Sequence, residues 1–418
     1  MKIKKSELWL YVVFSIIFFW DLIERYFPNL QFVFLLLILM LNINHIKKFF
    51  TKEFFFIAFI VLLQGAINIA IGNNTFSDFI IQYFSIIVCY LSFSCVIYKC
   101  DSKRVICIYW KTAFIMAILG AAEIILSLAN VSFETKLLSL FVNTSFTQRV
   151  IGPFPRIASL CNEPSFLGYF LAPAIFLIIY SFYKKDYSYI EFNQKKQILE
   201  ACLIFIVYIM TFSTVSYIGI IISFVLIFMN DKISLRKIVL PLIAVLCVLF
   251  LYTNVPDFKM RVDDTYNMFF NENTHTGTVN LSTFTYYANS KVVKESITST
   301  YGLGTGLGSY KYQFDKYNIG AWGDSGLNLN REDGNSMLFR ITTELGIIGI
   351  LSVFIFLYIL FCKSNGKNRI YAMAFLTLFL MIIIRMGNYT HGGIWLYICL
   401  YIKLCEENMN SDNIISEK

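Results

Sequence analysis

Charged residues are scarce in this sequence. Only 15% of its 418 residues are Asp, Glu, Lys or Arg, whereas 57% are hydrophobic. Soluble domains average roughly 25% charged and 45–50% apolar residues. The shortage extends along the whole chain, which excludes a soluble domain with a single anchor, an intrinsically disordered chain and collagen.

Residue patterns that mark common catalytic and metal sites are also missing. The chain has three His residues and no Cys-x-x-Cys pair or His/Cys cluster of zinc-site spacing. Of its ten Cys residues, only Cys161 is expected near the outer face, and one outside thiol cannot form a disulfide framework. The sequence contains no Walker motif, G-x-S-x-G, H-E-x-x-H or D-x-D. We therefore expect no metal and no cofactor.

The hydrophobic residues form long runs that predict membrane-spanning helices, each of which needs about 20 mostly apolar residues. Together they predict an all-α polytopic membrane protein with about 12 transmembrane helices. The predicted spans are roughly 8–27, 29–44, 54–71, 79–98, 105–129, 165–183, 198–212, 214–230, 237–254, 339–362, 370–385 and 389–404.

Basic residues alternate between the connecting segments. Segments such as 47–52 and 99–104 are rich in Lys and Arg, whereas 72–78 has none. Since basic residues in short loops stay cytoplasmic, both termini are predicted inside. The net charge of +8 is then a topology signal and does not indicate a nucleic-acid partner. The predicted divisions are 1–254 (spans 1–9, with an outer loop at about 130–164), 255–338 (a long extracytoplasmic loop), 339–404 (spans 10–12) and 405–418 (a cytoplasmic tail).

The first segment with candidate functional residues is 149–168, which leads from the first outer loop into a span. It carries Arg149 and Arg156, and Glu163 stands directly before Pro164. Proline suits a first helical position, so Glu163 is predicted at the positive end of a helix dipole. A functional site and a capped loop with interfacial arginines both fit this pattern.

The second segment is 333–349. Asp333, Asn335 and Ser336 are N-cap residue types before an apolar run. Arg340 and Glu344 follow at i, i+4 and share a helix face, so a structural ion pair and a functional pair are both open.

A glycine-rich segment, GLGTGLGSY at 302–310, superficially resembles a phosphate loop. It lacks the Lys-Ser/Thr ending and is predicted outside the cell, so a tight loop against the membrane face is the favoured interpretation. Remaining outer-face candidates are His275, Arg385 and His391. Glu123, inside a predicted span near its outer side, could line a cavity.

Two motifs, in this order and topology, resemble the superfamily of O-antigen polymerases (Wzy type) and O-antigen ligases, which are GT-C membrane glycosyltransferases. The first motif is R-x-x-S-x-x-x-E-P-S-x-x-G. The second is G-x-G-x-G before a polar loop, followed by N-S-x9-G-x-x-G. They are carried by Arg156, Ser159, Glu163, Pro164, Ser165, Gly168, Gly304, Gly306, Asn335, Ser336, Gly346 and Gly349. Where the ligase branch has His, this chain has Asn335, which favours the polymerase branch.

The resemblance implies a GT-C-like fold and a bacterial polysaccharide polymerase in the inner membrane. Such an enzyme moves a growing glycan from polyprenyl pyrophosphate to a new lipid-linked repeat unit at the outer face. Further candidate partners are membrane lipids, a chain-length regulator and a flippase. The alternatives are an O-antigen ligase, a flippase for the same lipid-linked unit, or a scaffolding subunit.

The departing pyrophosphate needs fixed cations, and Arg contacts phosphate oxygens with two parallel donors. The predicted cations are Arg156, Arg340 and Arg385, assisted by Arg149 or Arg331. Glu163 is the first candidate for the base at the acceptor hydroxyl, followed by Asp333 and His275. A direct displacement predicts inversion at the anomeric carbon.

Overall fold

The structure is a computed structural model of an all-α chain, with one two-residue strand pair in which β1 (Val150–Ile151) runs antiparallel to β2 (Phe154–Pro155). The described residues are 5–18, 27, 29–129, 150–151, 154–161, 163–186, 194–230, 249, 252–254, 256–270, 281–317, 329–363, 366–390 and 394–416.

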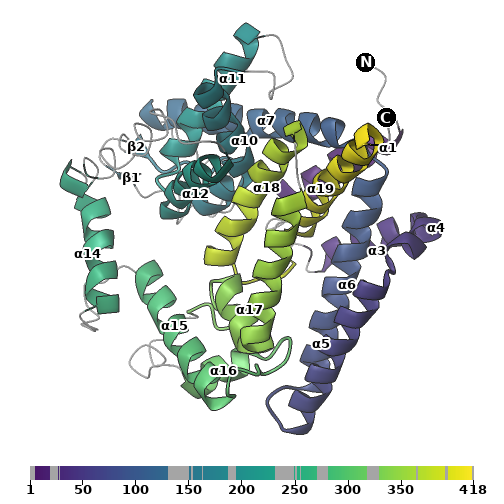
Figure 1. The fold of residues 1–418 in the computed structure, drawn as a ribbon. Helices are drawn as coiled ribbons and strands as arrows, with labels where there is room; N and C mark the ends of the chain where they lie inside the picture. Colours follow the sequence, from purple (N-terminus) through teal and green to yellow (C-terminus); the bar gives the residue numbers. More distant parts are fainter. Residues whose placement is uncertain are drawn as a thin grey trace.

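Most of the helices pack together into one bundle, and the helices between residues 256 and 317 lie at one side of it (Figure 1). The helices are α1 (Lys5–Phe18), α3 (Leu30–Leu41), α4 (Ile43–Ile46), the 3₁₀ helix η1 (Lys47–Phe49), α5 (Lys52–Ala70), α6 (Phe76–Tyr98), α7 (Ser102–Leu128), α10 (Pro164–Lys184), α11 (Gln194–Met210), α12 (Thr214–Asn230), α14 (Pro256–Phe270), α15 (Leu281–Ser299), α16 (Tyr310–Tyr317), α17 (Met337–Lys363), α18 (Gly366–Arg385) and α19 (Ile394–Ser416).

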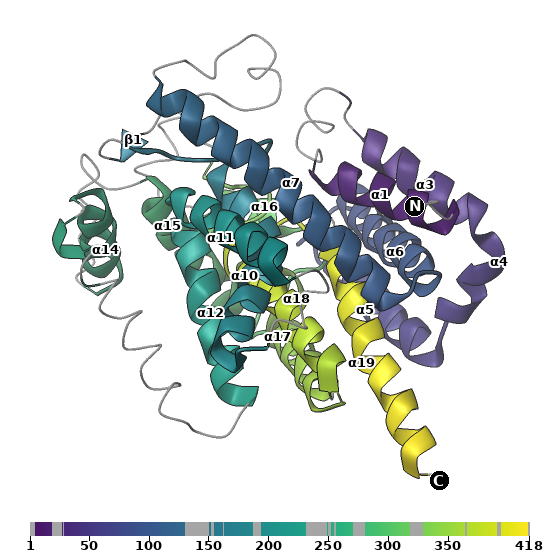
Figure 2. The same ribbon diagram turned by 90° about the horizontal axis from the view of Figure 1, so that it is seen from above.

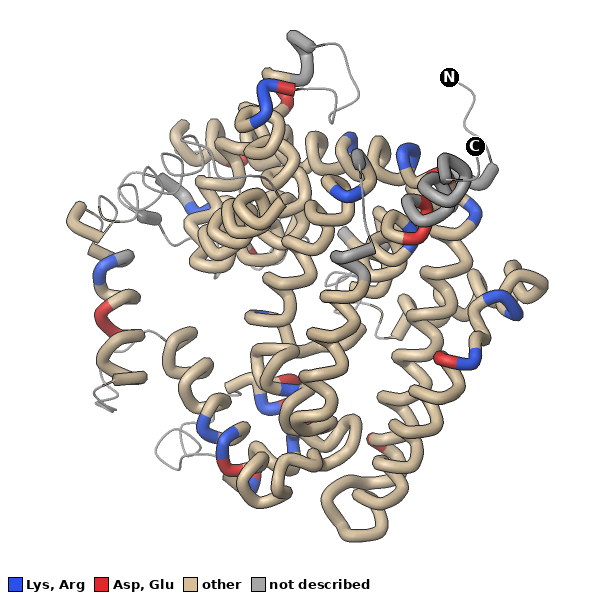
Figure 3. The backbone as a smooth tube through the Cα atoms, viewed as in Figure 1, with Lys and Arg blue, Asp and Glu red and all other residues tan. Residues whose placement is uncertain are grey.

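Six helices among the described residues are long and apolar enough to cross a membrane, namely α5, α6, α7, α10, α17 and α18. Each matches a predicted span, which confirms a polytopic α-helical membrane protein. Long stretches of α5, α6 and α17 contain no charged residue (Figure 3). The predicted span 29–44 ends early, because α3 and the α4–η1 segment meet at an 81° bend; counted as one, they make a seventh.

The other predicted spans are confirmed less fully. Helices α11 and α12 form as predicted but are short for a span. Helix α1 ends at Phe18, and residues 19–26 and most of 231–251 lie outside the described residues. Helix α19 begins at Ile394, and residues 391–393 before it are also outside. The number twelve therefore stays a prediction.

Helix α10 lies at the centre of the bundle, against α7, α11, α12 and α18 (Figure 2). Over an 18-residue apolar stretch of α10, 83% of the residues are buried, whereas over such a stretch of α5 only 11% are. A helix that is apolar all round either sits in a protein core or faces lipid. Helix α10 is the first case, whereas the exposed Phe and Ile side chains of α5, such as Phe55 and Ile57, are what a helix in contact with lipid presents.

A second, smaller core belongs to the predicted outer loop. Helices α14, α15 and α16 pack around it, on the side of the molecule opposite the chain ends (Figure 1). Inside this core Asn289 donates to the Leu329 carbonyl (2.8 Å) and accepts from the Tyr310 hydroxyl (2.6 Å). Residues 255–338 thus contain packed structure of their own.

Candidate functional site

The first motif leads into the start of α10 as predicted. Pro164 is in the first turn and Glu163 is the N-cap residue, with extended backbone at φ −137°. The half-buried Glu163 carboxylate does not cap the helix but accepts a hydrogen bond from Ser165 Oγ at 3.0 Å. One turn later Gly168 lies so close to α12 that a Cβ there would be 2.3 Å from Ser216 Oγ. The glycine lets the two helices approach.

The preceding residues of this motif are buried against α7 and α11. Arg156 is 9% exposed, and the Ile157 N–H donates to the Met210 carbonyl at 3.1 Å. Ser159 has φ +54° and donates from Oγ to the Met116 carbonyl at 3.0 Å. The segment is therefore a buried loop that is hydrogen-bonded to both α7 and α11.

The second motif joins α17 to the end of α18. Ser336 is the N-cap of α17, because its Oγ accepts from the Phe339 N–H (3.4 Å), and it also donates to the Ile383 carbonyl (2.9 Å). Asp333 accepts from the Asn335 N–H at 3.0 Å, and Asn335 has φ +55°. Of the three predicted cap residues, Ser336 is the cap, and Asp333 shapes the turn before it.

Arg340 and Glu344 form the i, i+4 ion pair at 2.9 Å, with side chains 8% and 0% exposed. The Arg340 guanidinium also donates to the Gly387 carbonyl (3.2 Å) and to Gln82 Oε1 (2.8 Å), and it lies over the Tyr389 ring at 4.5 Å. This guanidinium has its charge offset by Glu344 and a hydrogen-bond partner on each of its three nitrogens. This geometry favours the structural interpretation of the pair.

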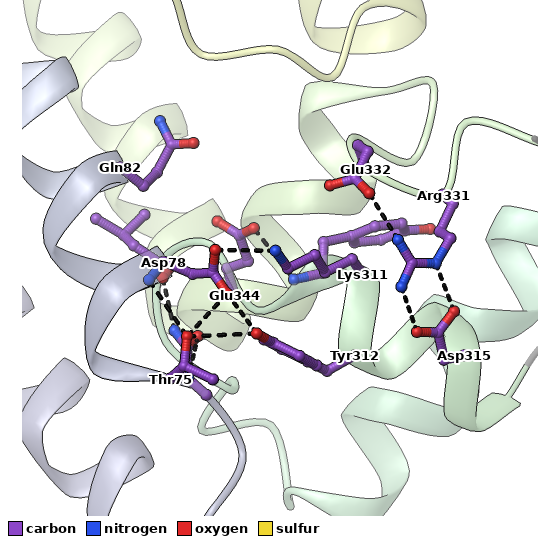
Figure 4. A network of polar contacts seen from close by, with 12 residues as sticks. Thr75, Asp78, Gln82, Lys311, Tyr312, Asp315, Arg331, Glu332 and Glu344 are labelled. Carbon is purple, nitrogen blue, oxygen red and sulfur yellow. Dashed lines mark hydrogen bonds and ion pairs between the residues drawn. The ribbon is translucent and has the colours of Figure 1, made fainter.

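Arg331 is likewise paired. It donates to Asp315 at 2.5 and 2.6 Å and to Glu332 at 2.6 Å (Figure 4). The hydrogen bonds to Asp315 raise the pKa of the guanidinium further. Two neighbouring carboxylates offset its charge, which makes it a poor anchor for an anion.

Arg385, the last residue of α18, differs from these two. Its side chain is half-buried and lies over the Tyr286 ring at 5.4 Å. Within the part of the chain that the structure describes, no carboxylate forms an ion pair with it. Burial raises the pKa of the Tyr286 hydroxyl, and the Arg385 charge offsets part of that rise. Arg385 is thus a cation beside an aromatic face, with its charge available.

The second motif lies beside Arg385, and the helix that begins at the first motif packs against the same helix, α18. Ser336 donates to the Ile383 carbonyl near the end of α18, and Gly387, two residues after Arg385, lies directly against the Asp333 carbonyl. Helix α10, whose N-cap is Glu163, packs along α18. Tyr286 contacts the first turn of α17, where its ring lies 4.6 Å from that of Phe339. A cation, two carboxylates and aromatic rings, drawn from α10, α15, α17 and α18 and the turns that precede them, make up this candidate site.

The glycine-rich loop has a partner that the sequence did not indicate. Helix α17 is broken at Gly346, with φ +71° and ψ −165°. The loop supplies backbone hydrogen bonds there: Gly306 N–H donates to the Glu344 carbonyl (2.7 Å), and Ile347 N–H donates to the Gly302 carbonyl (3.0 Å). A Cβ on Gly304 would lie 2.5 Å from the Gly346 nitrogen. The predicted tight loop is confirmed, and it sets the position of the α17 half that carries Arg340.

The other glycines of this motif line the same junction. A Cβ on Gly306 would lie 3.2 Å from the Asn68 side chain and 3.4 Å from that of Asn74. Gly349 follows one turn after the break. Gln64 closes the junction by donating to the Leu303 carbonyl (2.9 Å) and the Glu344 carbonyl (3.1 Å).

Three sequence candidates, Arg149, His275 and His391, lie outside the described residues. Among the described residues, no three His, Cys, Asp or Glu side chains gather as metal ligands. Sequence reasoning did not single out Tyr389, whose ring lies against Arg340, since an aromatic residue at the start of an apolar run carries no local signal of function. No protein-family model and no curated protein matches this chain.

Proposed function

We propose that this protein is a polysaccharide polymerase of the bacterial inner membrane. It transfers a growing glycan from polyprenyl pyrophosphate to a new lipid-linked repeat unit. The observation that carries the proposal is that the second motif, with Asp333, packs against the end of α18 beside Arg385, while α10, whose N-cap is Glu163, packs along the same helix. The resemblance of the two motifs to O-antigen polymerases supports it, and the segments that hold these motifs supply two of the three charged residues.

Arg385 is the first cation for the departing pyrophosphate. Its guanidinium has no carboxylate partner among the described residues, unlike Arg331 and Arg340. A preorganised charge donor of this kind contributes roughly 10²–10³-fold in rate. Arg156 stands second, because it belongs to the same motif as Glu163, and Arg149 remains a sequence candidate.

Glu163 is the proposed base for the acceptor hydroxyl. Its carboxylate is half-buried and accepts from Ser165, which leaves the other oxygen for a substrate proton. General-base catalysis contributes about 10²–10⁴-fold. Asp333 and His275 are the alternatives. A single displacement then inverts the anomeric carbon.

The proposed arrangement in the membrane has about twelve spans in a GT-C-like fold, with both termini cytoplasmic. It places α14, α15 and α16 on the periplasmic side, next to the glycan. A chain-length regulator and a flippase are the proposed partners.

The test is extension of defined lipid-pyrophosphate repeat units by the purified protein. We expect Arg385→Ala to lower the rate by about 10²–10³-fold. Arg331→Ala is the matched control, since that arginine is paired with Asp315 and Glu332, and it should retain most activity. Equal activity of Arg385→Ala and the unsubstituted protein would contradict the proposed role of Arg385 as a ligand of the pyrophosphate.

The alternatives give different results in the same system. A ligase transfers glycan to a lipid A-type acceptor and leaves single repeat units unextended. A flippase moves a fluorescent lipid-linked sugar across vesicles without forming any glycosidic bond. A scaffolding subunit does neither.

A further inference from the structure

Glu123 is a carboxylate inside the membrane-spanning helix α7, and it is 4% exposed. An ionisable group at such a place is costly, and it persists where it has a definite task. Its Oε2 accepts two hydrogen bonds from consecutive backbone N–H groups, those of Ala158 (3.3 Å) and Ser159 (2.8 Å). One oxygen of this side chain therefore holds two backbone N–H groups from a distant segment of the chain.

These two N–H groups belong to the first motif, between Arg156 and Glu163. The positive φ of Ser159 accompanies a turn in which consecutive N–H groups point toward the same oxygen. Ser159 Oγ adds a bond to the Met116 carbonyl, also in α7. Glu123, which lies outside the motif itself, thus attaches the loop to α7 together with the Ser159 bond and the packing of Ile157 against Gly120.

We infer that Glu123 is a positioning residue, which holds the Arg156–Glu163 segment so that Arg156 is presented to the departing pyrophosphate and Glu163 to the acceptor hydroxyl. The catalytic consequence of this inference rests on the proposed function, whereas the attachment of the loop to α7 by Glu123 does not. Misplacing a catalytic group by about 1 Å can cost about 10²-fold in rate, so loss of the attachment should reach activity without direct contact.

Cys161 provides a readout of the attachment that is independent of activity. Its side chain is 6% exposed, and its N–H donates to the Ala158 carbonyl at 3.0 Å within the held loop. In the purified full-length protein, maleimide labelling at Cys161 is followed by peptide mass spectrometry. We expect Glu123→Ala to label at least ~10-fold faster than the unsubstituted protein. Glu123→Gln keeps an oxygen acceptor and should label at nearly the original rate.

Chain extension is measured on the same variants. Glu123→Ala should lose about 10²-fold in rate, and Glu123→Gln should restore most of it. Ile125→Ala, at a 66% exposed position of the same helix, is the matched control and should change neither readout. If Glu123→Ala does not reach the membrane, Glu123→Asp, which retracts the carboxylate by one methylene, carries the test with smaller effects in the same direction.

The outcomes separate the two proposals. Unchanged Cys161 labelling in Glu123→Ala and Glu123→Asp would overturn the attachment. Faster labelling with full chain extension would overturn the positioning role. If the unsubstituted protein extends no chains, the proposed function fails, while the labelling comparison still decides whether Glu123 holds the loop.

Discussion

The buried pair of Arg340 and Glu344 yields the sharpest prediction on stability. Replacing Arg340 by Met leaves the Glu344 carboxylate at 0% exposure without its cation, although the Tyr310 N–H still donates to it at 3.4 Å. Breaking a buried ion pair in this way costs about 3–5 kcal/mol, because the remaining charge stays desolvated. We expect Arg340→Met to lower the free energy of unfolding by that amount.

Replacing both residues removes the isolated charge. The double variant Arg340→Met, Glu344→Met still leaves the Gln82 side chain and the Gly387 carbonyl without their guanidinium partner. An unsatisfied buried polar group costs about 1–3 kcal/mol, so the recovery is partial. We expect a coupling energy of about 2 kcal/mol between the two sites, at the upper part of the range for contacting residues.

The measurement is unfolding in mixed micelles, followed by tryptophan fluorescence, for both single variants and the double variant. A zero coupling energy, or an Arg340→Met protein as stable as the original, would refute the reasoning. Chain extension by the double variant then decides the role of Arg340. Activity close to the original supports a purely structural pair, whereas a folded but inactive double variant makes Arg340 a substrate ligand.

The remaining predictions concern the glycine loop, the α16 attachment and metals. Gly304→Ala should lower the unfolding temperature and the rate of chain extension, because a Cβ at φ +79° would lie 2.5 Å from the Gly346 nitrogen; an unchanged melting curve would contradict this. Lys311 donates to Asp78 at 2.8 Å (Figure 4), and this bond raises its pKa above the ordinary 10.5. The bond between Lys311 and Asp78 contributes less than about 1 kcal/mol, because the pair is partly exposed. This contribution is present below pH 10.5 and is lost as the pH rises through the raised pKa of Lys311. Limited proteolysis of the α15–α16 region should therefore accelerate above about pH 10.5 in the original but not in Lys311→Met. EDTA should leave chain extension unchanged, and a loss restored by Mg²⁺ would contradict the metal-free mechanism.

Local pattern was sufficient for several features of this protein. Apolar runs predict the spans at α5, α6, α7, α10, α17 and α18, because a helix needs about 20 apolar residues to cross a bilayer. The start of α10 at Pro164 and the i, i+4 pairing of Arg340 with Glu344 likewise depend on neighbours within one helical turn. Such features are set by backbone geometry and solvation, which act over a few residues.

Other features were decided by tertiary structure alone. Arg340 has a carboxylate four residues away in the sequence, but only the packed structure pairs Arg331 with Asp315 and leaves Arg385 over a tyrosine ring. The match of the glycine loop to the break at Gly346, and of Glu123 to the amides of Ala158 and Ser159, joins segments far apart in the chain. Whether a charge is satisfied depends on which groups lie within hydrogen-bonding distance, and that is determined by how the helices pack against one another.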